Sequence, residues 1–389
     1  MPGKKKVILV LDGESGQALR AVRCLRQERI FEIHVVSRIS SAPIRLSRHV
    51  KSFNFIDKLE SDEKYLSRIT TLISDLEVDL VFPILERSVA LLIAHRARFE
   101  NLCSIAPIPD AKTFETATDK RLLGQFMFEH GIPAPGTTVL DGVHGNFDTI
   151  KSLSFPMLAK PGKGGFGRDI HRFDSLSELT SFLEDPKVTC ADYAIQPFIV
   201  GADVECSVIC KDGQILAHTI QHTIIESKRT FGPPTGIEFV EDPEVLEIVR
   251  QLMFLLRWQG VAHIDLRRDE FGRYNVLEIN ARYWGSLLGS LAAGVNFPLL
   301  SAQIALAQSP DKPTARKTRY GVGPLGFQKR RAQMRAGILL ANTVFPHMIK
   351  DRFPMSPRRH PCFETLCDER YVDTSSLTQH CPSRGAARF

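Results

Sequence analysis

The sequence has no long apolar run and no dense set of cysteines. No stretch of its 389 residues approaches the ~18 apolar residues that a membrane-spanning helix requires. The basic N-terminus leads into an apolar run of only five residues, Val7–Leu11, which is too short for a secretory signal. The eight cysteines are scattered, a spread that favours reduced thiols over a disulfide framework. We therefore expect a cytoplasmic protein without a transmembrane segment.

Acidic residues are scarce at the C-terminal end of the chain. From Pro310 to Phe389 there are 15 Lys and Arg residues against 6 Asp and Glu, whereas residues 1–309 carry 35 against 38. The basic character therefore belongs to a C-terminal extension, residues 310–389, whose end we expect to be disordered. Its apolar and basic pattern leaves open a weak peripheral association with a membrane, or docking on the main body. The main body gives no indication of a nucleic-acid partner.

The N-terminal region alternates between two kinds of pattern. Short apolar runs typical of buried strands are separated by segments whose apolar residues recur at helical spacing. The expected strands are 6–11, 31–37 and 79–84, and the expected helices are 15–28 and 65–76. This βαβ alternation predicts an α/β domain over residues 1–108, built on a doubly wound parallel sheet.

Residues 109–309 have a different, mixed α+β pattern. A helix over 110–130 is followed by a strand, a glycine-rich loop and a series of strands that includes a hairpin turn at residues 211–213. Asp242 and Pro243 are typical of a helix start. We expect one module with two lobes, at about 138–199 and 200–309. The expected strands are 155–160, 193–198, 202–210, 214–222, 261–268 and 274–280, and the expected second helix is 242–257.

The last two of these strands carry the strongest indication of chemistry. A hairpin that turns at Phe271 and Gly272 places Asp265 opposite Glu278. Directly opposed carboxylates repel one another unless a divalent cation lies between them. Asn280 shares their face, and a set of oxygen ligands suits Mg²⁺. The alternative is a solvated polar face. We also expect Glu278→Gln to relieve repulsion and slightly stabilise the metal-free protein.

Two further segments could contact a nucleotide. Lys160 ends a strand and precedes Gly162, Gly164, Gly165, Phe166 and Gly167, where the backbone can approach phosphate oxygens. This is not a Walker A loop, and alone it fits a surface turn equally well. Gln196, Phe198 and Ile199 enter a short connection that could read an adenine edge. Glu205, in the next strand, could accept hydrogen bonds from ribose hydroxyls.

The order of these features resembles the ATP-grasp superfamily. Lys120, Lys160 with its glycine loop, Gln196–Ile199, Asp265 and the stretch Glu278–Arg282 occur in the family's sequence order. The resemblance covers about residues 5–308 and lies nearest the carboxylate–amine ligase branch. It is similar to the ATP-binding parts of carbamoyl phosphate synthase, biotin carboxylase and D-alanine–D-alanine ligase. Ala281 stands where the family usually has proline, and Gln196 where it often has glutamate.

The resemblance implies a role for each matching residue. Lys120 and Lys160 would contact nucleotide phosphates, with the glycine loop closing over them. Gln196, Phe198 and Ile199 would line the adenine slot, and Glu205 would hold the ribose. Asp265, Glu278 and Asn280 would bind one or two Mg²⁺, with Mn²⁺ as a substitute. Arg282 would stabilise the transferred phosphoryl group, and Lys228 or Arg229 could offer further cations.

The implied activity is an ATP-dependent ligase. It would phosphorylate a small carboxylate to an acyl phosphate and pass the acyl group to an amine, releasing ADP and phosphate. Two alternatives remain at this point: a carboxylase-type subunit that makes carboxyphosphate, and a catalytically silent ATP-binding module. A homodimer is compatible with each of them.

Overall fold

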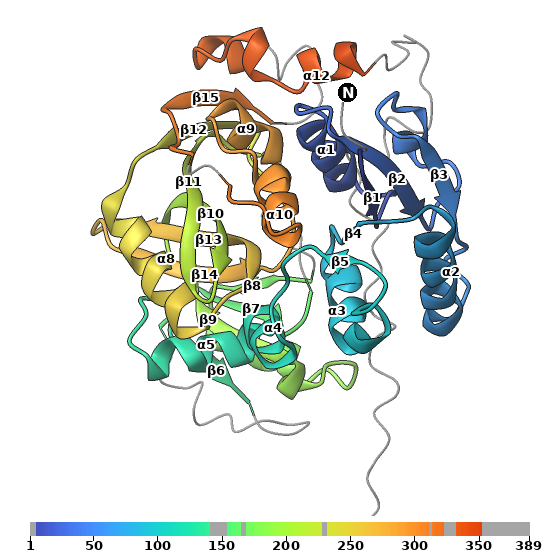
Figure 1. The fold of residues 1–389 in the computed structure, drawn as a ribbon. Coiled ribbons are helices and arrows are strands. Elements are labelled where there is room, and N and C mark those ends of the chain that lie inside the picture. The colour runs from blue at the N-terminus through green and yellow to red at the C-terminus, as the bar shows by residue number, and fades with distance from the viewer. Residues whose placement is uncertain are drawn as a thin grey trace, which may run out of the picture.

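The computed structural model describes residues 5–140, 154–164, 169–227, 232–310, 313–322 and 332–351. They form three sheets, with helices packed against them (Figure 1). None of the helices in these ranges is long and apolar enough to span a bilayer.

The N-terminal domain is the predicted parallel sheet. Its strands lie in the order β3-β2-β1-β4-β5, and each neighbouring pair is parallel. The side chain of Ser15 caps the first helix and that of Ser61 caps the second. The elements are β1 (Lys6–Val10), α1 (Gly16–Leu25), β2 (Phe31–Ser37), β3 (Ser52–Phe55), α2 (Asp62–Asp75), β4 (Leu80–Phe82), α3 (Glu86–Ala94) and β5 (Ser104–Ile105).

The single helix predicted over 110–130 is wrong. The chain forms α4 (Ala111–Thr118) and α5 (Lys120–Glu129), separated by Asp119 in an extended conformation (φ −100°, ψ 114°). The Asp119 carboxylate accepts hydrogen bonds from the backbone N–H and the guanidinium of Arg121, and so caps α5. The break makes Lys120 the first residue of α5.

A small antiparallel sheet forms the first lobe of the second module. Its strand order is β6-β9-β7-β8, from β6 (Thr138–Val139), β7 (Met157–Pro161), β8 (His171–Phe173) and β9 (Tyr193–Pro197). Helix α7 (Leu176–Leu183) packs its buried Leu179 and Leu183 into the same core. In β7, Met157 and Ala159 face that core, so Leu158 and Lys160 project from the opposite side.

The second lobe is a six-stranded antiparallel sheet in the order β14-β13-β10-β11-β12-β15. Helix α8 (Pro243–Leu255) packs against it, with Asp242 as its N-cap, as predicted. The sixth strand comes from beyond residue 309, so the basic extension is in part integral to this sheet. The strands are β10 (Gly201–Lys211), β11 (Gln214–Ile225), β12 (Gly236–Val240), β13 (Gly260–Asp269), β14 (Tyr274–Asn280) and β15 (Thr318–Gly321).

The described end of the extension docks on the N-terminal domain. Helix α12 (Phe345–Lys350) lies close to α1 in Figure 1. Asp351, which follows α12, is fully buried and pairs with the buried Arg23 of α1 at 3.0 Å (Nε to Oδ2). The Ser47 hydroxyl donates to the other carboxylate oxygen at 2.6 Å. Helices α9 (Leu287–Ala292) and α10 (Phe297–Ala305) also contact α1.

Removing the charge of Asp351 is expected to be strongly destabilising. Asp351→Asn leaves the buried Arg23 guanidinium without its carboxylate, which typically costs about 3–5 kcal/mol. The matched control is Asp174→Asn, whose ion pair with Arg172 is exposed and should contribute at most ~1 kcal/mol. Urea unfolding measures both variants. Equal effects at the two positions would contradict the docking assigned to Asp351.

The docking of α12 on the N-terminal domain should weaken in acid, because α12 contains His347. Burial lowers the pKa of His347 to about 4, assisted by the nearby charges of Arg23 and Lys350. The unfolded chain therefore binds more protons than the folded one between pH 6.5 and 4, so stability falls as pH falls through this window. The thermal unfolding midpoint of wild type and of His347→Gln is measured from pH 7 to 4. A variant as acid-sensitive as wild type would show that His347 is not responsible.

Candidate active site

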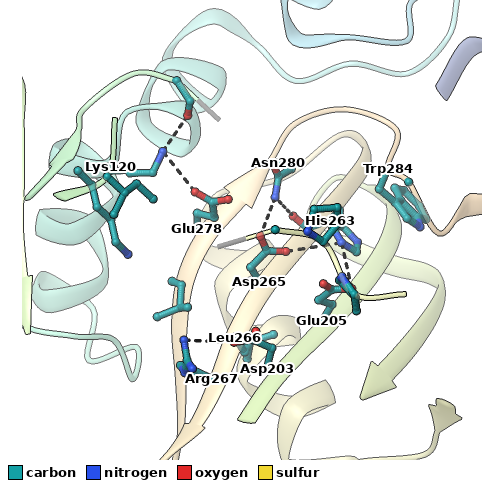
Figure 2. A pocket seen from close by; sticks show the side chains of 18 of the residues that line it. Lys120, Asp203, Glu205, His263, Asp265, Leu266, Arg267, Glu278, Asn280 and Trp284 are labelled. Atoms are coloured by element: carbon teal, nitrogen blue, oxygen red, sulfur yellow. Dashed lines mark hydrogen bonds and ion pairs between the residues drawn. The ribbon is translucent and has the colours of Figure 1, made fainter. Parts of the chain in front are cut away.

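Polar side chains fill one face of the six-stranded sheet. Alternate residues of β11, β10, β13 and β14 point to this face, while the residues between them, such as Val204 and Ile264, are buried in the core beneath. Cross-strand register sets the polar residues in two rows. The first row is Gln221, Glu205, Asp265 and Glu278, and the second is Thr219, Ser207, His263 and Asn280. Figure 2 shows the side chains from β10, β13 and β14 in the pocket.

The opposition of Asp265 and Glu278 is confirmed, but it depends on an irregularity that the sequence did not predict. Next to the turn, Leu266 pairs with Val276, and regular pairing would then set Asp265 opposite Leu277. A bulge adds one residue to β14 at this point and brings Glu278 opposite Asp265. Leu277, next to the bulge, lines the cleft.

Two buried lysines face the row of acids. Lys120 Nζ lies 3.3 Å from Glu278 Oε2 and donates to the Gly164 carbonyl at 2.8 Å (Figure 2). Burial lowers the pKa of Lys160 to about 8, although the Glu278 carboxylate opposes the shift. Burial acts to raise the pKa of Glu278, but the charges of Lys120 and Lys160 outweigh it and lower this pKa to about 2. Glu278 is thus the counter-ion of the lysines.

Asp265 shows the opposite shift. Burial raises its pKa well above the ordinary value, and the charges of Glu278 and Glu205 raise it further, although the charge of Arg282 acts against them. Its Oδ2 accepts a hydrogen bond from Asn280 Nδ2 at 3.2 Å, whereas its buried Oδ1 accepts none from any residue in the described ranges. Asn280 Oδ1 in turn accepts from Arg282 Nη2 at 2.8 Å.

The N-terminal domain reaches the same cleft. Glu86, the first residue of α3, has an oxygen 3.8 Å from Arg282 Nε. Burial raises the pKa of Glu86, and the charges of Arg282 and Lys120 oppose the shift. Gln17 of α1 lines the cleft together with Trp284 and Gly285. No role for Gln17 was predicted from the sequence.

The predicted adenine segment lies at the edge of the first lobe. Gln196 is buried, and its Nε2 donates to Thr137 Oγ1 at 2.8 Å, while its Oε1 accepts no hydrogen bond within the described structure. The ring of Phe198 lies between two guanidinium groups, with Arg172 at 4.7 Å and Arg267 at 5.1 Å from its centroid. Ile199 follows and is partly buried.

Glu205 lies deeper in the sheet than a ribose contact at the adenine end would suggest. It is beside Asp265 in the first row, with its Oε2 3.5 Å from His263 Nε2, and it accepts a hydrogen bond from Gln221. Asp203 is two residues before Glu205 in β10, so it lies on the same face and nearer the adenine segment. It lines the cleft, and its Oδ1 lies 3.4 Å from Arg267 Nη1. Sequence reasoning missed His263, although it is two residues before Asp265 and so shares its face.

The remaining predicted residues fall into two groups. Gly162 accepts a hydrogen bond from the backbone N–H of Lys120 at 2.8 Å, and Gly164 lines the cleft with a positive φ of 130°. Gly165, Phe166 and Gly167 of the glycine loop, and the cations Lys228 and Arg229, lie outside the described residues.

A family model described as ATP-grasp in the biosynthetic pathway with Ter operon matches residues 192–325, which contain Glu205, Asp265, Glu278, Asn280 and Arg282.

Residues 192–325 form an ATP-grasp domain.

Curated proteins to which the chain is similar include ligases. D-alanine–D-alanine ligase B of Pseudomonas putida is 24% identical over 174 residues, or 42% of this chain and 54% of that protein. The vancomycin B-type resistance protein VanB of Enterococcus faecalis is 22% identical over 256 residues, or 59% of this chain and 73% of that protein. The chain thus spans about half the length of the D-alanine–D-alanine ligases that it matches.

Solved structures share the fold across most of the chain. The biotin carboxylase domain of 2-oxoglutarate carboxylase from Hydrogenobacter thermophilus, in complex with MgADP, ADP and bicarbonate, aligns with a TM-score of 0.64 and 18% identity, covering 81% of this chain and 72% of that one. An L-amino acid ligase from Bacillus licheniformis aligns with a TM-score of 0.59 and 19% identity, covering 80% and 76%. At these identities the likeness establishes the ATP-grasp fold.

Proposed function

We propose that the protein is an ATP- and Mg²⁺-dependent ligase that joins a small carboxylate to an amine through an acyl phosphate. The observation that carries this proposal is the arrangement of charges at the cleft. Lys120 and Lys160 face one end of the acidic row, and Arg282 lies just beyond Asn280 on the same edge. Such a set neutralises charge on a phosphoryl group passing between two oxygens.

The residues present fit a Mg–nucleotide. Three carboxylates stand side by side across β10, β13 and β14, an arrangement that a cation stabilises. The buried Oδ1 of Asp265 and Oε1 of Gln196 accept no hydrogen bond from described residues, so each is available to a ligand. Asp265, Glu278 and Asn280 would hold Mg²⁺, which would neutralise charge on the phosphates. Because Asn280 turns its nitrogen toward Asp265, ligation through Oδ1 requires its amide to rotate.

The nucleotide would run from the first lobe to the acidic row. Gln196 Oε1 would accept from the adenine amino group, beside Phe198 and Ile199, while Leu158, Leu266 and Leu277 give apolar walls. Asp203 is better placed than Glu205 to accept from ribose hydroxyls, so we transfer that role to Asp203. Lys120, Lys160, Gly162 and Gly164 would contact the phosphates, with Gly165, Phe166 and Gly167 continuing the loop.

In the proposed reaction, the substrate carboxylate attacks the γ-phosphate in line, and ADP leaves. Arg282 would stabilise the negative charge on the phosphoryl oxygens, and Lys228 or Arg229 could add to it. The amine then attacks the acyl carbon, and phosphate leaves with the C–O bond electrons. Gln17 of the N-terminal domain, with Trp284 and Gly285, would form the acceptor end of the cleft, beside Arg282 and its partner Glu86.

The test is release of ADP and phosphate from MgATP in the presence of paired carboxylates and amines. Amino acid pairs should support turnover that neither partner supports alone. Turnover with bicarbonate and no amine would instead favour a carboxylase-type activity, in line with the bicarbonate bound in the biotin carboxylase relative. Nucleotide binding without turnover under any pair would point to a silent ATP-binding module.

A further inference from the structure

Glu205 and His263 lie beside the proposed Mg²⁺ ligand Asp265, and the Mg²⁺ role does not use them. Glu205, His263 and Asp265 each offer one ligand atom, and these atoms lie within 4.8 Å of one another. Glu205 comes from β10, and the other two residues come from β13 (Figure 2). All three side chains point to the same face of the sheet. Glu205 is on one side of Asp265, and Glu278 with Lys120 is on the other.

The distances in this cluster match those between ligands of a single metal ion. His263 Nε2 lies 3.5 Å from Glu205 Oε2 and 3.5 Å from Asp265 Oδ1. These separations are longer than the ~2.7–2.9 Å of a charge-assisted hydrogen bond. Ligand atoms about 2.1 Å from a tetrahedrally coordinated ion lie about 3.4 Å apart. The facing atom of Asp265 is the buried Oδ1 that accepts no hydrogen bond from the described residues.

Each candidate ligand is held in place by a second polar side chain. Ser207 Oγ lies 2.9 Å from His263 Nδ1, which directs Nε2 toward the two carboxylates. Gln221 donates to Glu205 and itself accepts from Ser286 Oγ at 2.9 Å. The indole of Trp284 stacks on the buried imidazole, with centroids 5.2 Å apart and planes 7° from parallel. Outer partners that fix the orientation of an imidazole and a carboxylate are typical of metal sites.

We propose that Glu205, His263 and Asp265 bind a divalent transition-metal ion such as Zn²⁺, Mn²⁺ or Co²⁺. An imidazole nitrogen with two carboxylate oxygens selects such ions over Mg²⁺, which prefers oxygen ligands alone. Asp265 would bridge this ion through Oδ1 and the Mg²⁺ site through Oδ2. Binding of this ion needs no nucleotide, so it can be tested separately from the ligase activity.

The experiment is titration of the full-length protein with Co²⁺ in the absence of nucleotide. Visible absorption reports the coordination number, and X-ray absorption reports an imidazole ligand. We expect one site in the wild type, with His263→Asn and Glu205→Gln weakening it by at least ~100-fold, and Ser207→Ala by about 10–100-fold. Glu270→Gln, the matched control at an exposed position in the turn of the same hairpin, should retain affinity within about threefold.

Three results would overturn the proposal. The first is a wild-type protein that binds no Co²⁺. The second is binding that persists unchanged in folded His263→Asn. The third is binding lost equally in Glu278→Gln, which would place the ion in the phosphate site. Thermal unfolding of each metal-free variant checks its fold, and Ser207→Ala preserves the test if His263→Asn does not fold. MgATP turnover is measured separately and tests only the ligase proposal.

Discussion

Replacing Glu278 by glutamine is expected to reduce Mg²⁺-dependent ATP turnover by at least ~10³-fold while the protein remains folded. Glu278 is a proposed metal ligand and the counter-ion of Lys120 at 3.3 Å. Loss of its charge weakens Mg²⁺ binding. It also leaves Lys120 and Lys160 without their counter-ion, so they would hold the phosphates in positions that do not favour transfer. Several kcal/mol of transition-state stabilisation depend on the ion, which corresponds to this factor.

The structure also reverses the expected effect of this substitution on stability. From the hairpin alone, we predicted that Glu278→Gln would relieve repulsion between the two opposed carboxylates and slightly stabilise the protein. In the fold, the charges of Lys120 and Lys160 lower the pKa of Glu278 to about 2 despite its burial, so the ionised carboxylate stabilises the native state. We therefore expect a lower thermal midpoint without metal. The control is Glu270→Gln, at an exposed position in the turn of the same hairpin. Wild-type turnover in Glu278→Gln would refute the ligand assignment.

Substituting Arg282 by alanine is expected to lower kcat by about 10²–10³-fold, the usual cost of removing one group that stabilises transition-state charge. KM for ATP should change less than about threefold, because Arg282 is assigned to the transferred phosphoryl group rather than to the bound nucleotide. The variant also removes the cation 3.8 Å from Glu86, so its thermal midpoint is measured alongside the kinetics.

The matched control for Arg282→Ala is Arg273→Ala on the same hairpin. Arg273 is exposed and pairs with Asp269 in the turn, far along the strand from Asn280. Its removal should leave kcat unchanged. If Arg282→Ala raised KM for ATP while kcat stayed at the wild-type value, Arg282 would be a binding residue and the role given to it in phosphoryl transfer would be wrong.

The features that could be predicted from the sequence depend on short-range patterns. The parallel domain follows from apolar runs separated by helical spacing, and Asp242 with Pro243 marks the start of α8. The opposition of Asp265 and Glu278 was predicted by counting residues back from the turn. The pairing nearer the turn is shifted by one residue from that count, and the bulge in β14 corrects the shift. The resemblance to the ATP-grasp superfamily depended on the order of a few polar residues, and their convergence on one face agrees with it.

The features that were missed depend on contacts between distant segments. Asp119 breaks a continuous helical pattern because its side chain captures Arg121, which also reaches the Ala191 carbonyl in the first lobe. The strand β15 pairs with β12 from beyond the expected boundary, with Arg319 and Glu238 in an ion pair. His263 was overlooked because a single histidine in a strand carries no signal until Glu205 from another strand is placed beside it.

The central claim is that the protein activates a carboxylate as an acyl phosphate. The most direct test follows ¹⁸O from a labelled carboxylate substrate during a single turnover with MgATP and an amine, with the products analysed by ³¹P NMR and mass spectrometry. Attack at the γ-phosphate transfers one labelled oxygen to inorganic phosphate and leaves ADP unlabelled. The positions of Lys120, Glu278 and Arg282 around one acidic row predict this result. Label in AMP, with pyrophosphate as the other product, would contradict it.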